Sequence, residues 1–443
     1  MKRVPAKALS LFDSTCIIVG IIVGAGIYET TPMVAACMGG WGGVMAVWLA
    51  GGLLALCGAL CYAELATTYP RQGGDYVYLN RAYGRWAGFL FGWSQLAVIR
   101  PCDIALMAFV FARYASTLYA PFPGIGTFYA TGAVVALTTI NVLGVRESKW
   151  TQNLLTVVKV AGLLFIVVAG LLAPVPEAVP SLGRFSGGGL ELAMILVLFT
   201  YGGWNEMAYV AAEIKEPRKN IPRSLVLGTL VVVVLYLLIN GAFLHALGFE
   251  GLAASEAVAV DAVATVLPDS AARVIGIIIC ISALGAVNGL IFTGARISYA
   301  FGMGHRVFQR LGKWHPGFGT PATALVVQGA LSLAIVLLAG SFIDTILYSA
   351  PVVWLFFLAT GLSLFRLRKK DAATPRPYKV VAYPLVPIIF SATCAFMFFS
   401  STTYALAEKP IGLLVLGSIL LAGCGLLLAG GDGFRPGNFP GSG

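Results

Sequence analysis

The sequence predicts an all-α integral membrane protein with 12 transmembrane helices, and three observations support this fold class. Of its 443 residues, 58% are hydrophobic and only 11% are charged, whereas about a quarter of the residues in soluble proteins carry charge. Twelve spans of about 20 residues each fit within a chain of this length and hydrophobicity. Runs such as residues 225–244 are apolar on every face, unlike the alternating strands of a membrane barrel. A soluble enzyme is therefore excluded.

The individual spans follow from apolar windows that end at charged residues, glycine or proline. Each window is long enough, or nearly long enough, to cross the hydrocarbon core as a helix. In chain order, the expected spans are residues 15–37, 42–68, 85–116, 127–144, 151–173, 190–212, 223–248, 273–303, 321–340, 344–365, 383–404 and 409–430.

The connections between these spans alternate in charge. Most of the 29 Lys and Arg residues fall on one side of the predicted membrane, with a dense group in residues 366–379. The connection at 249–272 instead carries Glu250, Glu256, Asp261 and Asp269 and is expected on the external side. By the positive-inside rule, both termini are expected in the cytoplasm. The net charge of +10 thus reflects sidedness and does not indicate nucleic acid binding.

Two of the spans are interrupted by glycine near their middle. Gly24 and Gly26 lie in the first span, and Gly202 and Gly203 lie in the sixth. Broken spans at matching places in two five-helix halves indicate an inverted-repeat transporter. Unwinding frees backbone groups that need partners inside a bilayer. A zwitterionic amino acid offers them, with its carboxylate at a positive helix end and its ammonium on free carbonyls.

Four blocks of sequence then resemble a known family: YAELATTYPRQGGDYVYLNRAYG (62–84), IRP (99–101), FTYGGWNEMAYVAAEIKEPRKNIPRS (199–224) and GAVNGLIFTGARISYAFGMGHRVF (285–308). Together they resemble prokaryotic members of the L-type amino acid transporter family, within the amino acid, polyamine and organocation (APC) superfamily. The resemblance implies the leucine-transporter-type 5+5 inverted repeat, with discontinuous helices 1 and 6 and two extra helices. It also implies secondary active, sodium-independent exchange of L-amino acids by alternating access, or proton-coupled uptake, in a prokaryotic plasma (inner) membrane.

The same resemblance divides the chain. Residues 1–173 would form the first repeat with helices 1–5, and residues 174–367 the second repeat with helices 6–10. Residues 368–440 would hold helices 11 and 12 and the C-terminal tail. Residues 441–443, Gly-Ser-Gly, are typical of a cloning scar.

Carried over by position, the resemblance implies a substrate site between the two broken helices. The backbone of the first would bind the carboxylate, and the sixth would serve the ammonium and gating. Phe199 matches an aromatic residue that closes over substrate. Asn205 matches a polar pocket residue, although a helix-to-helix hydrogen bond is the alternative. The expected substrate-binding residues are Ile22, Gly24, Ala25, Gly26, Asp103, Phe199, Thr200, Tyr201, Gly202 and Asn205, and the expected coupling and gating residues are Lys159, Tyr236 and Phe199.

Lys159 is an ammonium in the middle of an apolar span, where burial is costly and a function is the default interpretation. The alternative is that its side chain extends to the membrane interface. In this fold the fifth span packs against the broken first helix, so Lys159 would supply the positive charge that sodium supplies in sodium-driven relatives. Tyr236 matches a tyrosine that also reaches that helix. Whether Lys159 releases a proton during transport stays open.

Asp103 departs from the family, which commonly has small hydroxyl residues after Arg100 and Pro101. An aspartate inside a span should face a partner or a cavity. Either it pairs with a basic group such as Arg100, or it lines the pocket and attracts a cationic side chain or a proton. Neutral L-amino acids are slightly favoured as substrates. A cationic amino acid or polyamine transporter that uses Asp103 is the alternative.

Other interpretations have less support. No cofactor is expected, and His305 and His315 lack ligands at metal-binding spacing. Animal family members join a heavy chain through a cysteine after span three, and residues 115–128 contain none, so no covalent heavy-chain subunit is expected. The eight cysteines read as small core residues. A channel is disfavoured by the paired broken helices, and an amino acid sensor with a transporter fold is less favoured than a transporter.

Overall fold

The computed structural model describes residues 7–174, 189–268, 270–338, 342–408 and 410–429. The regular structure of this part of the chain is helical, with one isolated parallel bridge between Leu9 and Ile214. The expected cloning scar, residues 441–443, lies outside the described residues. The all-α fold class predicted from the sequence is therefore confirmed for the described part.

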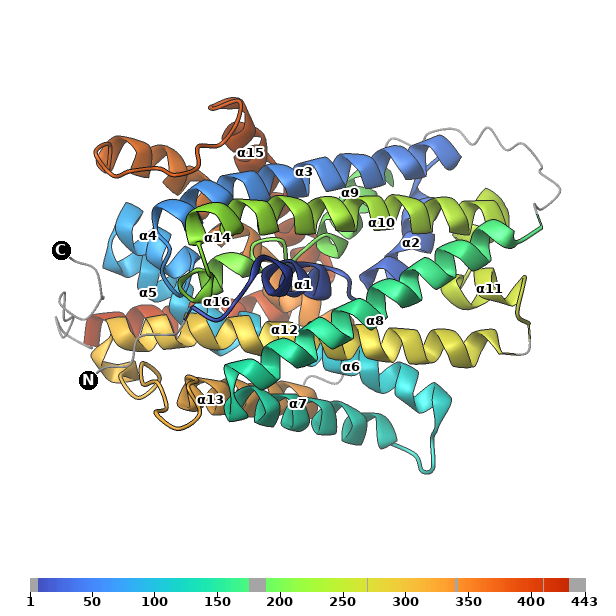
Figure 1. Ribbon diagram of the computed structural model, residues 1–443, viewed down its shortest axis with the longest axis horizontal. Coiled ribbons are helices and arrows are strands. Elements are labelled where there is room, and N and C mark those ends of the chain that lie inside the picture. The colour runs from blue at the N-terminus through green and yellow to red at the C-terminus, as the bar shows by residue number, and fades with distance from the viewer. Residues whose placement is uncertain (1–6, 175–188, 269, 339–341, 409, 430–443) are drawn as a thin grey trace.

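The helices follow the predicted spans closely (Figure 1). Several extend past the apolar window into polar flanks, where the first N–H groups and last carbonyls of a helix, which lack partners within it, can find polar partners or water. In chain order they are α1 (Leu11–Ile22), α2 (Gly26–Cys37), α3 (Trp41–Thr68), α4 (Asp75–Tyr83), α5 (Arg85–Ser94), η1 (Gln95–Ile99), α6 (Arg100–Leu118), α7 (Ile125–Leu143), α8 (Val145–Leu172), α9 (Gly189–Thr200), η2 (Glu206–Glu213), α10 (Pro217–Ala254), α11 (Val258–Ala264), α12 (Ala271–Gly304), η3 (Arg306–Phe308), α13 (Ala322–Leu338), α14 (Phe342–Lys370), α15 (Leu385–Glu408) and α16 (Pro410–Ala429).

Eight helical segments of the described chain are long and apolar enough to cross a membrane by themselves. The pair α1 and α2 forms a ninth when counted as one bent span, with an angle of 48° at the break. Three further apolar segments, in α9, α13 and α16, are shorter. The structure thus supports a bundle of eight or nine spans by length, and the number twelve stays a prediction.

The first helix lies in the middle of the bundle, where α1 contacts α8, α10 and α12 (Figure 1). Ser10 caps its amino end, since its hydroxyl accepts from the Asp13 N–H at 3.2 Å while Asp13 accepts from the Ser10 N–H at 2.9 Å. Asn153 and Lys149 of α8 donate to the same Asp13 carboxylate at 2.6 and 3.3 Å. The start of α1 is therefore fixed to α8.

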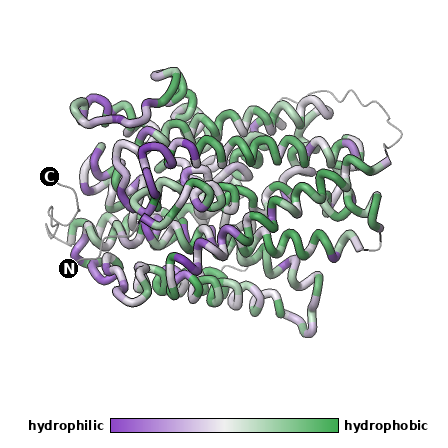
Figure 2. Tube along the Cα trace, in the orientation of Figure 1, coloured by the Kyte–Doolittle hydropathy of each residue, from purple (hydrophilic) through white to green (hydrophobic). Residues whose placement is uncertain are grey.

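Polar residues gather toward the end of the bundle that holds α4 and the α14–α15 connection, while long helices elsewhere are mostly hydrophobic (Figure 2). Outward apolar side chains such as Leu154, Val168 and Leu172 of α8 are more than half exposed. In a soluble protein so much exposed apolar surface would be a liability. Here it is the surface that a lipid bilayer covers.

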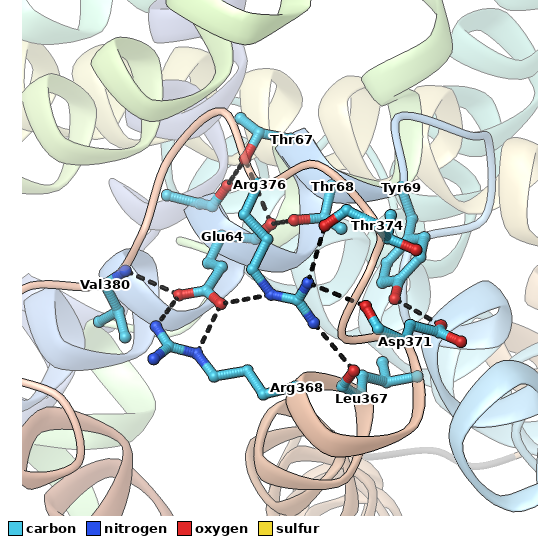
Figure 3. Close-up of polar contacts among 11 residues, drawn as sticks. Glu64, Thr67, Thr68, Tyr69, Leu367, Arg368, Asp371, Thr374, Arg376 and Val380 are labelled. Atoms are coloured by element: carbon cyan, nitrogen blue, oxygen red, sulfur yellow. Dashed lines mark hydrogen bonds and ion pairs between the residues drawn. The ribbon is translucent and has the colours of Figure 1, made fainter.

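A buried carboxylate fastens the polar end (Figure 3). Glu64 of α3 is 2% exposed and accepts hydrogen bonds from Arg368 at 2.6 and 2.8 Å and from the Val380 N–H at 2.7 Å. Arg376 approaches it to 3.4 Å. These contacts join the end of α3 to the end of α14 and to the loop that leads to α15.

The eight cysteines are all free thiols, and most are buried within the bundle. They agree with the interpretation as small core residues.

Candidate functional site

The first helix breaks between Ile22 and Gly26. Within the break, the Gly24 N–H turns back to the Ile22 carbonyl at 2.7 Å. The N–H groups of Ala25, Gly26 and Ile27 have no backbone acceptor in the described part of the chain. They form the amino end of α2, which carries a partial positive charge and suits an anionic group.

On the other side of this break, at the carboxyl end of α1, the free groups are backbone carbonyls. Side chains of three neighbouring helices donate hydrogen bonds to them. Lys159, 1% exposed, donates to the Gly20 and Val23 carbonyls at 2.6 and 2.5 Å. Ser282 donates to the Val23 carbonyl at 3.1 Å, and Tyr236 to the Ile22 carbonyl at 2.9 Å. The Lys159 side chain therefore does not extend to the membrane interface. Its charge lies on the negative, carboxyl end of α1.

The sixth span breaks after Thr200, and the chain resumes as the 3₁₀ helix η2 at Glu206. Gly203 lies within this break at φ +109°, a conformation that side chains rarely adopt, and a Cβ there would lie 2.8 Å from Ile21 of α1. Thr200 binds Thr30 of α2 through a hydroxyl–hydroxyl contact of 2.9 Å. Tyr236 also donates to the Thr200 carbonyl at 3.3 Å. The two breaks therefore lie side by side.

A cavity opens beside the two breaks. Four predicted substrate-binding residues line it, namely Asp103, Phe199, Gly202 and Asn205. Further lining comes from α1, the α5–η1–α6 segment, η2, α12 and α14. Those lining residues include Ile21, Gln95, Arg100, Met107, Glu206, Tyr209, Ala286, Ser349 and Trp354.

The remaining predicted site residues lie next to this cavity and are not part of its lining. A Cβ on Gly24 would lie 3.4 Å from Met107, which lines the cavity, and one on Gly26 would lie 3.2 Å from Thr200. Ile22 and Ala25 are buried within the break. The side chain of Tyr201 faces α3, where its hydroxyl donates to the Trp48 carbonyl at 3.2 Å. For Tyr201, only the backbone remains a candidate for substrate contact.

Arg100 pairs with a carboxylate that the sequence reasoning missed. Its Nη2 lies 2.7 Å from Glu206 Oε1, and its Nε donates to Gln95 at 3.0 Å. Thr293 donates to the second Glu206 oxygen at 2.5 Å. Within the described residues Asp103 has neither an ion pair nor a hydrogen bond. Of the two alternatives for Asp103, the geometry thus favours the cavity.

Glu206 carried a sequence signal, because a carboxylate three residues after Gly203 in a membrane span needs a partner. The partner, Arg100, is 106 residues away along the chain, so spacing alone could not identify it. A second feature that the sequence reasoning missed is the π-helical turn η1, which supplies Gln95 and Ile99 to the cavity. Pro101 lies two residues after η1 ends, and a proline, which cannot donate to the helix ladder, is a sequence cue for such a turn.

The comparisons with known proteins agree on a family. The amino acid permease family model matches residues 9–420. The chain is 32% identical to the b(0,+)-type amino acid transporter 1 of Mus musculus over 398 residues, which cover 87% of this chain and 81% of that protein. It is 30% identical to the serine/threonine exchanger SteT of Bacillus subtilis over 396 residues, which cover 88% and 90%.

A third relative, the large neutral amino acids transporter small subunit 2 of Oryctolagus cuniculus, is 32% identical over 402 residues, which cover 87% of this chain and 74% of that protein. By name, two of these relatives are amino acid transporters and one is a serine/threonine exchanger. The chain's own apolar helices suit a multi-pass plasma membrane protein. By sequence and by fold, the chain belongs to the amino acid permease family and, within it, to the L-type amino acid transporters.

Proposed function

We propose that the chain exchanges L-amino acids across the membrane by alternating access, and that it binds the α-carboxylate and α-ammonium at the two helix breaks. The observation that carries the proposal is the set of N–H groups at Ala25, Gly26 and Ile27 that have no backbone acceptor among the described residues. They lie beside a cavity lined by Gly202 and Asn205. Inside a bilayer such groups are tolerated where a ligand satisfies them. Exchange is also what the name of the bacterial relative states.

Sodium independence follows from Lys159 in this proposal. The ammonium donates to the Gly20 and Val23 carbonyls. A sodium ion bound at this end of α1 would need the same carbonyl oxygens as ligands. A second cation so close would be repelled, since like charges a few ångströms apart in a poorly screened interior destabilise each other. Proton-coupled uptake, in which Lys159 gives up its proton during the cycle, remains the alternative coupling.

Alternating access also needs contacts that close one side, and the structure offers a set near η2. Arg296 of α12 binds Glu213 at 2.8 and 3.2 Å, with both side chains at most 1% exposed. Gln72 donates to the same carboxylate at 3.1 Å, and Leu9 forms its bridge beside it. We infer that this cluster separates on opening toward that side.

The finer architecture belongs to the same proposal. It comprises twelve spans, an inverted repeat at residues 1–173 and 174–367, two extra helices in 368–440, both termini in the cytoplasm and no covalent heavy chain. The bend at the first break and the short 3₁₀ segment at the sixth support the paired discontinuous helices.

A counterflow screen in proteoliposomes tests the proposal. Liposomes loaded with each common L-amino acid would be assayed for uptake of the labelled compound. Each would be compared with its decarboxylated amine, such as ethanolamine for serine, and with a few polyamines. The proposal predicts exchange of several amino acids and none of the matched amines, because α2 requires a carboxylate. Equal transport of the amines would contradict the assigned site.

Cationic side chains are the second candidate substrate class, and Asp103 is the observation that favours it. Glu206 pairs with Arg100, so the Asp103 carboxyl group lines the cavity with neither an ion pair nor a hydrogen bond to the described residues. An unpaired buried charge is costly, and a ligand ammonium or guanidinium relieves that cost. Competition by lysine, arginine, leucine and alanine in wild type and in Asp103→Ser decides between the classes. A cation preference that disappears in the variant supports the role, and an unchanged ranking contradicts it.

A further inference from the structure

A chain of hydrogen-bonded side chains leads from the cavity wall toward α4. Asn205 Nδ2 donates to the Tyr209 hydroxyl at 2.8 Å, and that hydroxyl donates to Asp75 Oδ2 at 2.7 Å. Tyr62 donates to the other Asp75 oxygen. Asn205 and Tyr209 line the cavity. Asp75 is 0% exposed and begins α4, outside the spans.

The direction of each hydrogen bond in this chain is determined by Asp75. An ionised carboxylate only accepts, so both tyrosine hydroxyls must donate to it. Tyr209 has one hydroxyl hydrogen, and Asp75 receives it. The Tyr209 oxygen can then only accept from Asn205, which must offer its NH₂ group. The amide oxygen of Asn205 is left facing the other way.

That amide oxygen has no partner within the described residues, and Asn205 lies on the cavity wall. We infer that Asp75, acting through Tyr209, fixes the Asn205 amide so that it presents an oxygen acceptor to the substrate ammonium. Asp75 and Tyr209 are thus positioning residues of the site, and Asp75 itself touches no substrate. The inference rests on the proposed function, because it assumes that an amino acid occupies this cavity.

In this arrangement, the orientation of the Asn205 amide depends on whether Asp75 is ionised or protonated. Burial raises the pKa of Asp75 to about 6, although hydrogen bonds from Tyr62 and Tyr209 lower it. The carboxyl is therefore ionised at neutral pH. Once protonated it carries a hydrogen of its own and can donate to Tyr209, which frees the tyrosine hydrogen to turn toward Asn205. The titratable groups that face Asp75 are Tyr62 on α3, Tyr209 and Glu206 on η2, Cys394 on α15 and Tyr78 on α4.

The test is the KM of L-serine exchange in proteoliposomes between pH 5 and 8. In wild type we expect KM to rise as the pH falls through about 6. In Asp75→Asn we expect KM to be raised about 10-fold or more at every pH, as for the loss of a charge-assisted hydrogen bond, with little pH dependence left. A purely structural role for Asp75 would lower thermal stability and yield without changing KM or its pH profile.

Tyr209→Phe and Tyr62→Phe form the matched pair. Each variant removes one tyrosine hydroxyl that donates a hydrogen bond to Asp75. Only Tyr209→Phe also removes the hydroxyl oxygen that accepts from Asn205 and orients its amide. At pH 8, where Asp75 stays ionised, Tyr209→Phe should raise KM about 10-fold, and Tyr62→Phe should leave KM nearly unchanged. Equal effects of the two variants, or a wild-type KM in Asp75→Asn, would overturn the inference. This pair decides the question even if Asp75→Asn does not fold. Wild-type protein that exchanges no amino acid would instead refute the proposed function.

Discussion

Replacing Lys159 with alanine removes two charge-assisted hydrogen bonds from the carboxyl end of α1, at 2.6 and 2.5 Å. Each such bond contributes about 1.5–3 kcal/mol. Loss of both bonds therefore costs about 3–6 kcal/mol of stabilisation. Part of this loss is offset, because the variant no longer has to bury an ammonium away from water. We take about 3 kcal/mol as the expected loss. It corresponds to a shift of about 100-fold in the equilibrium that favours this arrangement of α1.

We therefore expect Lys159→Ala to lower the rate of amino acid exchange by about 100-fold while the bundle still folds. The assay is counterflow in proteoliposomes, with thermal stability of the purified protein measured in parallel. Ser282→Ala is the matched control, because Ser282 donates to the same Val23 carbonyl at 3.1 Å but carries no charge. Its rate should fall by no more than about 10-fold. Wild-type exchange in Lys159→Ala, or an equal loss in both variants, would refute the role of the charge.

Three further predictions concern the breaks, the polar end and subunit composition. Gly26→Val and Gly202→Val should each abolish measurable substrate binding. A Cβ at Gly26 would already lie 3.2 Å from Thr200, and one at Gly202 would lie 3.0 Å from the Phe199 carbonyl. Near-normal affinity in either variant would show that the site is misplaced. Glu64→Gln should lower the free energy of unfolding by about 3–5 kcal/mol, because it leaves two guanidinium groups without a carboxylate, and an unchanged melting temperature would contradict that. The chain purified alone should exchange amino acids, and a requirement for a disulfide-linked second subunit would contradict the expectation that no covalent heavy chain is needed.

Much of the fold was predictable because the hydrophobic windows are long and the breaks contain glycine. The positions of the helices and the bend between α1 and α2 follow from those two signals. The family was predictable from four blocks of sequence, and the comparisons confirm it. The roles assigned to the individual site residues stay predictions, although Lys159 and Tyr236 do contact the first break.

The parts that sequence reasoning missed depend on contacts between distant segments. The sequence offers several acidic residues as possible partners for Arg100. In the folded protein its ion-pair partner is Glu206. Asp75 reads as the start of a short polar helix, and its link to Asn205 exists because η2 places Tyr209 between them. Tyr201 adjoins two glycines of a broken span, yet its ring packs between Trp48 and Tyr236. Hydropathy and local spacing contain no information about such pairings.

The most direct test of the central claim is labelled amino acid uptake into proteoliposomes under sodium-free conditions, with and without an unlabelled L-amino acid inside. The account predicts saturable uptake that needs the internal amino acid and is unchanged when sodium is added. The same preparation with Gly26→Val should show none. Uptake that requires sodium, or no uptake of any common L-amino acid by folded wild-type protein, would contradict the account.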